Sequence, residues 1–226
     1  RRGAGGAAAA PGLRAARGDG DLRRSGGLGP PGMSLRLDLL RHGETESGGG
    51  FRGSLDDALT ARGWAQMRTA VEGGRWDLLV SSPLQRCRAF AEELAQRQGI
   101  ELELENDLRE LHFGAWEGRS AAALMDGHSE ALGRFWADPY AFTPPGGEPL
   151  SEFEARVLAA QRRLRQRHAG RRVLLVTHGG VIRLLLACAR GLPRERLLQV
   201  DVGHGALFGL RAGEGDDRWH ECREGE

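Results

Sequence analysis

Two histidines, each placed directly after an apolar run and each followed by glycine, are the residues of this sequence best suited to chemistry. His42 follows residues 35–41, and His178 follows residues 173–177. Such runs are typical of buried parallel strands, and α/β sheets bind ligands at the carboxyl ends of their strands. One Arg-His-Gly triplet would be a weak signal, but the repeated strand-histidine-glycine unit predicts two imidazoles at one edge of a sheet.

Groups that bind anions accompany both histidines. Arg41 precedes the first one, and a guanidinium can hold an anion through two parallel N–H donors. Arg86 lies in the first turn of a helix expected after another strand, so it starts from the same edge. Gly179 begins the helix after the second histidine, and a helix N-terminus attracts anions. Together these groups predict a site for a phosphoryl group, whose transfer depends mostly on positioning and charge stabilisation.

Glu110 adds a carboxylate, in a partly apolar segment, that could move a proton. Glu44 and Glu117 lie nearby in the sequence and are alternatives for this role. The sequence contains neither a Walker loop nor a carboxylate-rich metal cluster. We therefore expect nucleophilic catalysis by histidine, with no metal and no cofactor.

Strand-like and helix-like runs alternate along the chain, which is typical of an α/β fold with three layers and a mostly parallel sheet flanked by helices. The expected strands cover residues 35–40, 77–81, 101–105, 172–177 and 205–211, with a short one around 219–222. The expected helices cover residues 60–72, 83–98, 151–168 and 179–189. Thr60, Ser82 and Ser151 are expected to cap the first three, Ser151 in a capping box with Glu154.

The alternation lapses between residues 108 and 150, where short helical pieces and a Pro/Gly loop are expected. This window holds six of the chain's 13 aromatic residues. We interpret residues 111–150, approximately, as a small helical cap. Its aromatic side chains could form the core of that cap or a stacking surface for a flat ligand.

Residues 1–32 consist mainly of Gly, Ala, Arg and Pro, so they are expected to form a disordered extension, and residues 33–226 a single domain. The extension carries a net charge of +4 and the whole chain +1, which leaves −3 for the rest. No clustered basic face or long apolar span is visible, so neither a nucleic-acid nor a membrane partner is expected. The three cysteines lack CxxC spacing, which favours reduced thiols and a cytoplasmic protein. A monomer or a homodimer is expected.

Five motifs resemble those of the histidine phosphatase superfamily, which has the phosphoglycerate-mutase-like fold, and they span residues 34–212 in the family's order. They are residues 41–45, residues 51–54 with 59–63, residues 81–86, Glu110 with Gly114 and residues 117–118, and residues 177–180.

The resemblance implies that His42 attacks phosphorus and becomes a phosphohistidine. It also implies that Arg41, Arg86 and His178 hold the phosphoryl oxygens, and that Glu110 protonates the leaving group. Gly179 would contribute a backbone N–H to the phosphate, and Arg52 either a guanidinium at the pocket edge or an exposed loop side chain.

Within this family the chain looks most like the alpha-ribazole phosphatases of cobalamin biosynthesis. The resemblance implies a small phosphomonoester substrate and hydrolysis, because the long basic insertion typical of phosphoglycerate mutases is absent between Arg86 and Glu110. Gly48 stands where many relatives carry asparagine, so one phosphate contact is missing or comes from the loop backbone. A broad-specificity phosphatase, a phosphoglycerate mutase and a non-catalytic phosphoryl-binding module remain alternatives.

Overall fold

The computed structural model describes residues 34–213 and 218–222. The extension expected over residues 1–32 lies outside the described residues. In the described part, no helix combines the length and the apolar character needed to cross a membrane.

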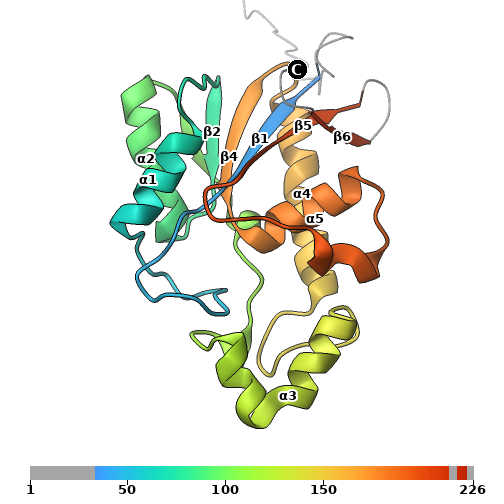
Figure 1. Cartoon of the computed structure of the whole chain (residues 1–226). Helices are drawn as coiled ribbons and strands as arrows, with labels where there is room; N and C mark the ends of the chain where they lie inside the picture. The colour runs from blue at the N-terminus through green and yellow to red at the C-terminus, as the bar shows by residue number, and fades with distance from the viewer. Residues whose placement is uncertain (1–33, 214–217, 223–226) are drawn as a thin grey trace, which may run out of the picture.

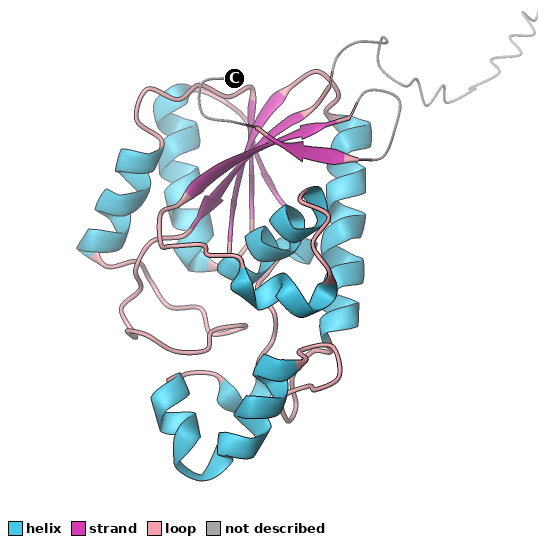
Figure 2. Cartoon of the chain, turned by 45° about the vertical axis from the view of Figure 1, so that its right-hand side comes forward, coloured by secondary structure: helices cyan, strands magenta, loops and turns pink. Residues whose placement is uncertain are grey.

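A six-stranded sheet with helices on both faces forms the centre of the molecule (Figure 1, Figure 2). Its strands are β1 (Arg36–Arg41), β2 (Leu78–Ser81), β3 (Leu102–Leu104), β4 (Arg172–Thr177), β5 (Leu207–Ala212) and β6 (Trp219–Glu221). The order is β3-β2-β4-β1-β5-β6, in which β1 to β4 run parallel and β5 and β6 antiparallel at one edge. The expected mostly parallel sheet is therefore confirmed.

The register of the two central strands positions the histidines. Arg41 at the end of β1 pairs with Thr177 at the end of β4, and the His42 backbone N–H donates to the Thr177 carbonyl at 2.9 Å. Because the strands are parallel neighbours, the residues that follow them leave the sheet side by side.

Helices cover the sheet as a three-layer fold requires. Helices α1 (Ala61–Ala70) and α2 (Gln85–Gln98) lie on one face, and α4 (Leu150–Arg167) and α5 (Gly179–Ala189) lie on the other. Alternate residues of β4 point to opposite faces, so Leu174 and Val176 join the core under α1 and α2 while Val173 and Leu175 join the other core. The sheet is thus buried on both sides, as its apolar strands predict.

One of the three expected N-caps forms. Thr60 caps α1, and its side chain accepts a hydrogen bond from the Gly63 N–H at 2.9 Å. The expected Ser82 cap is wrong, because α2 begins at Gln85 and its cap position is Leu84. The Ser82 hydroxyl lies instead against an imidazole, as described below.

The expected capping box of the helix after residue 149 is also wrong. Helix α4 begins at Leu150, with Pro149 in the cap position, so Ser151 already lies inside the helix. The cap position therefore lies two residues before Ser151, and proline is suited to a helix start because its fixed φ is near the helical value.

The expected cap segment is built around α3 (Ala121–Ala137), below the sheet in Figure 1, with the short 3-10 helix η2 (Gly114–Trp116) beside it. Its aromatic side chains serve two purposes. Trp116 is buried, and its ring packs against those of Phe51, Phe135 and Phe142. Trp136 is about half exposed, with 49% of its surface accessible. The buried cap aromatics therefore join the core on the α4 and α5 side of the sheet, and the cap leaves other aromatic surface available.

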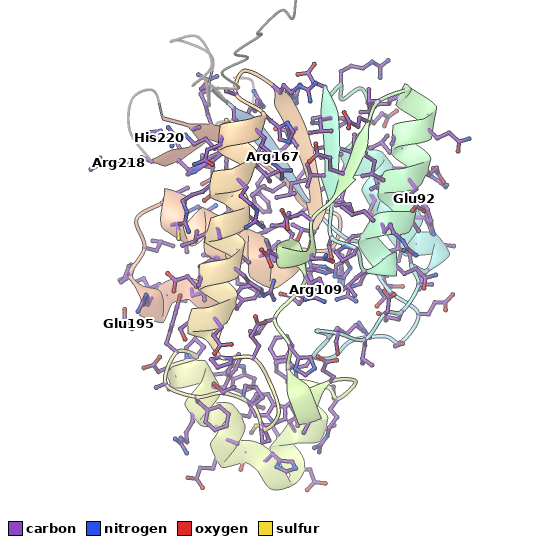
Figure 3. The ribbon with its side chains drawn as sticks, turned by 180° about the vertical axis from the view of Figure 1, so that it is seen from behind. Glu92, Arg109, Arg167, Glu195, Arg218 and His220 are labelled. Atoms are coloured by element: carbon purple, nitrogen blue, oxygen red, sulfur yellow. The ribbon has the colours of Figure 1, made fainter. Side chains whose placement is uncertain are left out.

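The arginine-rich end of α4 lies on the outer surface, where Figure 3 labels Arg167. Arg163 contacts the carboxylates of Glu105 and Asp107, and Arg167 contacts that of Glu103. These ion pairs offset much of the positive charge of this solvent-exposed helix end.

Replacement of Asp38 by alanine should lower the free energy of unfolding by about 1–3 kcal/mol, the usual effect of leaving a buried donor, here the Trp76 indole N–H, without its acceptor. Asp38 is 2% exposed, accepts a hydrogen bond from the Trp76 indole at 2.7 Å, and pairs with Arg172 at 2.7 Å. Urea denaturation measures the change. The control is Glu93→Ala, which breaks an exposed pair with Arg68 and should change stability by less than about 1 kcal/mol. Equal losses in both variants would contradict the prediction.

Candidate active site

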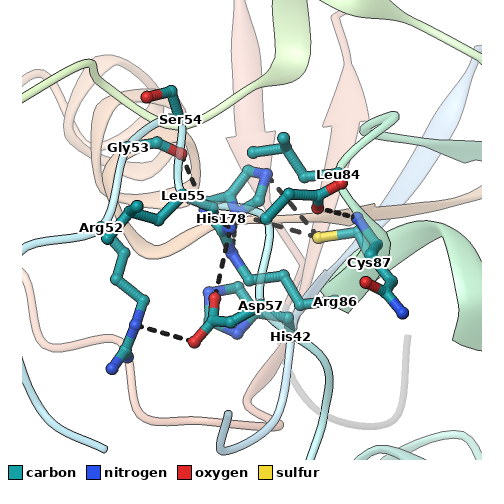
Figure 4. Close-up of polar contacts among 12 residues, drawn as sticks. His42, Arg52, Gly53, Ser54, Leu55, Asp57, Leu84, Arg86, Cys87 and His178 are labelled. Carbon is teal, nitrogen blue, oxygen red and sulfur yellow. Dashed lines mark hydrogen bonds and ion pairs between the residues drawn. The ribbon is translucent and has the colours of Figure 1, made fainter. Parts of the chain in front are cut away.

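The structure brings the two strand-end histidines together. The His42 and His178 ring centroids lie 5.3 Å apart with the rings inclined at 63°. His42 is 5% exposed and His178 is fully buried. Figure 4 shows both imidazoles beside the Arg86 side chain. Both histidines thus reach one pocket from sequence positions that are far apart.

The surroundings of His42 select one tautomer. Its Nδ1 lies 2.8 Å from the Gly43 carbonyl oxygen. Because a carbonyl can only accept, Nδ1 carries the hydrogen and Nε2 keeps its lone pair. Burial and then the positive charge of Arg86 hold the pKa of His42 well below its usual value of 6.5. The imidazole is therefore neutral, with Nε2 available as a nucleophile.

His178 is held in the opposite tautomer. Its Nδ1 accepts a hydrogen bond from Arg86 Nε at 3.3 Å, so the hydrogen resides on Nε2, which lies 2.7 Å from Ser82 Oγ. Burial and Arg86 keep its pKa well below 6.5 as well. Sequence reasoning missed this role for Ser82, because a serine before Pro83 at a helix start resembles a cap.

Arg86 is fully buried at the start of α2. It donates hydrogen bonds to the carbonyls of Gly53 and Leu55 at 3.1 and 2.5 Å. Its Nη1 also lies 3.8 Å from the Asp57 carboxylate. The side chain therefore ties the loop over residues 53–57 to the second histidine (Figure 4).

Arg52 lies on the same loop, and its side chain is only 9% exposed. Its Nε lies 2.9 Å from the Asp57 carboxylate, and its Nη2 donates to the Gly48 carbonyl. The exposed-loop alternative for Arg52 is therefore wrong. Asp57, between the two guanidiniums in Figure 4, was missed by sequence reasoning, because an acidic residue in a polar loop carries no distinctive pattern.

The backbone N–H of Gly48 does not point toward the histidines. Many relatives have asparagine at this position. That N–H donates to the Thr45 carbonyl at 3.2 Å. The loop therefore contributes the Gly48 carbonyl, as an anchor for Arg52.

Arg41 reaches the pocket from the end of β1. It donates to the Val202 carbonyl at 2.5 Å, and its Nη2 lies 3.1 Å from Nε2 of His204. Its buried Nε has no hydrogen-bond partner among the described residues, and a Cβ built on Gly179 would lie 3.2 Å from it. Burial lowers the Arg41 pKa, against the opposing charge of Glu110. Arg41 Nε–H is therefore a donor that the described residues leave unsatisfied, beside the N-terminus of α5.

His204, in the loop before β5, lies beside His42 and Arg41. Its ring centroid lies 5.6 Å from that of His42. Burial and the neighbouring Arg41 lower its pKa to about 4. It is therefore neutral near pH 7 and can accept a hydrogen bond from the guanidinium.

Glu110 lies at the N-terminus of α5. One carboxylate oxygen accepts from the Gly180 N–H at 2.9 Å and the other from the Leu111 N–H at 3.0 Å. A Cβ built on Gly180 would lie only 2.2 Å from a Glu110 oxygen, so this approach requires glycine. The Glu110 carboxylate thus binds the backbone N–H that follows Gly179 and lies near the expected anion site.

The two alternative carboxylates have other partners. Glu117 accepts hydrogen bonds from Ser54, Leu55 and Phe113. Burial raises its pKa, but the bonds from Ser54 and Phe113 outweigh this and the pKa is lowered. Glu44 contacts Thr60 at the start of α1. These contacts favour Glu110 as the proton donor.

Stability should fall as the pH falls through about 6.5, because both buried histidines have lowered pKa values. The unfolded chain then binds more protons than the folded one, so acid favours unfolding, by up to about 1.4 kcal/mol per pH unit for each histidine. Urea denaturation at about pH 7 and about pH 5.5 measures the slope. His178→Gln should reduce it, whereas the exposed His220→Gln should not. An equal slope in all three proteins would contradict the assignment.

Comparisons with known proteins agree with this geometry. The sequence pattern of the histidine phosphatase superfamily (branch 1) matches residues 37–224. An adenosylcobalamin/alpha-ribazole phosphatase of Escherichia coli is 32% identical over 176 residues, which cover 76% of this chain and 87% of that protein. A mycobacterial glucosyl-3-phosphoglycerate phosphatase solved with inorganic phosphate superposes with a TM-score of 0.73 at 29% identity, over 83% of this chain and 95% of that one.

A bifunctional protein of Mycobacterium tuberculosis is 35% identical over 191 residues, which cover 82% of this chain but only 50% of that protein. The chain therefore spans about half the length of this relative.

Proposed function

Since the chain belongs to the histidine phosphatase superfamily, we propose that it hydrolyses phosphomonoesters through a phosphohistidine formed on His42. The observation that supports this most directly is the neutral His42, which keeps its lone pair on Nε2 and whose ring centroid lies 5.3 Å from that of His178, itself hydrogen-bonded to Arg86. An anion-binding pocket with an available nucleophile suits phosphoryl transfer.

In the first step, His42 Nε2 attacks phosphorus while the bond from phosphorus to the ester oxygen breaks. Arg41 and Arg86 balance the charge of the phosphoryl oxygens. For His178 to join them as a donor, its Nε2–H must turn from Ser82 Oγ to the phosphate. A charged phosphoryl oxygen is a stronger acceptor than the carbonyls that these arginines contact. Glu110 gives its proton to the leaving oxygen, so the alcohol departs neutral.

In the second step, Glu110, now a carboxylate, takes a proton from water as that water attacks the phosphohistidine. The bond between Nε2 and phosphorus breaks and releases inorganic phosphate. His42 regains its lone pair and Glu110 its proton, so the site returns to its starting state.

Replacement of Glu110 by glutamine should lower kcat by about 10²–10⁴-fold for an alkyl phosphate, the usual contribution of general acid–base catalysis. The first step should suffer much less with 4-nitrophenyl phosphate, whose leaving group needs no protonation. Rapid mixing should then show a burst of nitrophenol before slow turnover. Glu44→Gln, with its carboxylate at α1, is the matched control and should stay within about threefold of wild type. Equal loss on both esters, without a burst, would contradict the assigned role.

We further propose alpha-ribazole 5′-phosphate as the first substrate to test. The name of the E. coli relative supports this choice. A mainly apolar cavity of about 300 Å³ beside Glu110, lined in part by Phe113, Phe135 and Trp136, also supports it. Flat apolar groups stack favourably on aromatic rings.

A phosphate-release screen tests this choice against the alternatives. It compares alpha-ribazole phosphate with sugar phosphates, nucleotides and phosphoglycerates, ranked by kcat/KM. A preference under tenfold, about 1.4 kcal/mol of transition-state binding, would identify a broad-specificity phosphatase. Isomerisation of phosphoglycerate faster than phosphate release would favour a mutase. Tight binding without any turnover would favour a non-catalytic phosphoryl-binding module.

A further inference from the structure

The cavity beside Glu110 contains one charged group to which the proposed chemistry gives no role. The cavity lies between the cap, α4 and α5, and most of its lining is apolar. Glu110 and Arg183 are its charged residues. Glu110 is the proposed proton donor, so the function of Arg183 is open.

Arg183 extends from the first turns of α5. It lies three residues after Gly180, whose N–H binds Glu110, so the two positions share one face of the helix. Arg183 Nε donates to the Val200 carbonyl at 2.8 Å, which fixes the plane of the guanidinium. Arg183 is also close enough to Arg41 for its charge to lower the Arg41 pKa.

The terminal nitrogens of Arg183 are uncommitted. Among the described residues, no hydrogen bond or ion pair reaches its Nη1 or Nη2. The carboxylate in the same cavity already accepts from the N–H groups of Leu111 and Gly180. A purely structural role as an anchor for Val200 would use one of the five N–H donors of a guanidinium.

This placement resembles a ligand site: apolar walls with a few fixed polar groups that set orientation. Arg183 is half-buried, and a partly desolvated cation gains most from an acceptor that is itself charged. The guanidinium is therefore positioned to contact the part of a substrate's leaving group that is remote from the phosphorus atom.

We propose that Arg183 is a specificity-determining residue that binds a hydrogen-bond acceptor on the leaving group, and that a carboxylate there is bound most strongly. This proposal rests on the proposed phosphatase activity of the same site, but on no particular natural substrate. A neutral ring nitrogen or hydroxyl would use the same donors more weakly.

The experiment compares 4-carboxyphenyl phosphate with phenyl phosphate in wild type and in Arg183→Met. The ratio of kcat/KM for the two esters is measured in each protein, and the wild-type ratio is divided by the variant's. This quotient cancels the different reactivities of the two leaving groups. We expect it to be at least about tenfold, as one charge-assisted hydrogen bond can supply. Arg190→Met is the matched control, because Arg190 ends the same helix and pairs with Glu221, and its quotient should be near one.

A quotient near one for Arg183→Met, with phenyl phosphate still hydrolysed, would overturn the role of Arg183 and leave the phosphatase proposal standing. Absence of turnover on every ester in wild type would overturn the phosphatase proposal instead. In that event, calorimetry with 4-carboxybenzylphosphonate and benzylphosphonate gives the same quotient from binding constants. Circular dichroism checks that Arg183→Met is folded, and Arg183→Lys, which keeps the charge without the planar fork, should give an intermediate quotient.

Discussion

Replacement of His42 by alanine should lower kcat by at least about 10⁴-fold, because no other group in the pocket can take over nucleophilic attack. The variant should also form no phosphoenzyme. The neighbouring imidazole, His178, has its hydrogen on the nitrogen that faces Ser82 and its lone pair directed at Arg86. It is therefore oriented as a donor and not as a second nucleophile.

Quenching in alkaline sodium dodecyl sulfate, followed by detection of acid-labile, base-stable phosphate on the protein, measures the intermediate. His204→Ala serves as the matched control. The His204 ring centroid lies 5.6 Å from that of His42, about as near as that of His178, and His204 has no assigned covalent role. The control should keep the label. Equal labelling of His42→Ala and wild type would remove His42 from the mechanism, while label lost in both variants would point to general damage of the pocket.

Replacement of Arg86 by alanine should lower kcat/KM by about 10³-fold, since it removes a full positive charge from the proposed phosphoryl site. It should also lower the free energy of unfolding by about 3 kcal/mol or more, because the carbonyls of Gly53 and Leu55 lose their donor inside the protein. Activity is therefore measured well below the unfolding transition of the variant.

A further readout separates the electrostatic role of Arg86 from a structural one. The positive charge of Arg86 is the second cause, after burial, of the lowered pKa of both His42 and His178. Its removal should raise both values, and nuclear magnetic resonance titration of the imidazole carbons measures this shift. The control is Arg88→Ala, an exposed residue of the same helix that pairs with Glu92, which should change neither activity nor titration. Unshifted histidines in a folded Arg86→Ala protein would contradict the assignment.

The fold could be predicted well from the sequence because its signals are local. Apolar runs of strand length are buried on both faces wherever they pair, and the β4 run from Arg172 to Thr177 was placed at its observed bounds. Helix starts were less predictable. Serine at positions 82 and 151 has the chemistry of a cap, but a hydroxyl caps a helix only if no stronger partner or proline-set backbone competes for the position.

The sequence by itself also determined which groups could act: two histidines after strands, Arg41 and Arg86 near them, and a glycine-led helix. These follow from residue type and spacing, which act over a few residues. Only the tertiary structure decided how these groups are held. The tautomer of His42 depends on the Gly43 carbonyl, that of His178 on Arg86 and Ser82, and the direction of Arg183 on the Val200 carbonyl.

Asp57 shows the same limit, since its value lies in its distance to two guanidiniums that reach it from different parts of the fold. Hydrogen bonds and charge interactions act over a few ångströms in space. The partners named here, whether neighbours in the sequence or far apart, therefore acquire their roles only when the chain has folded.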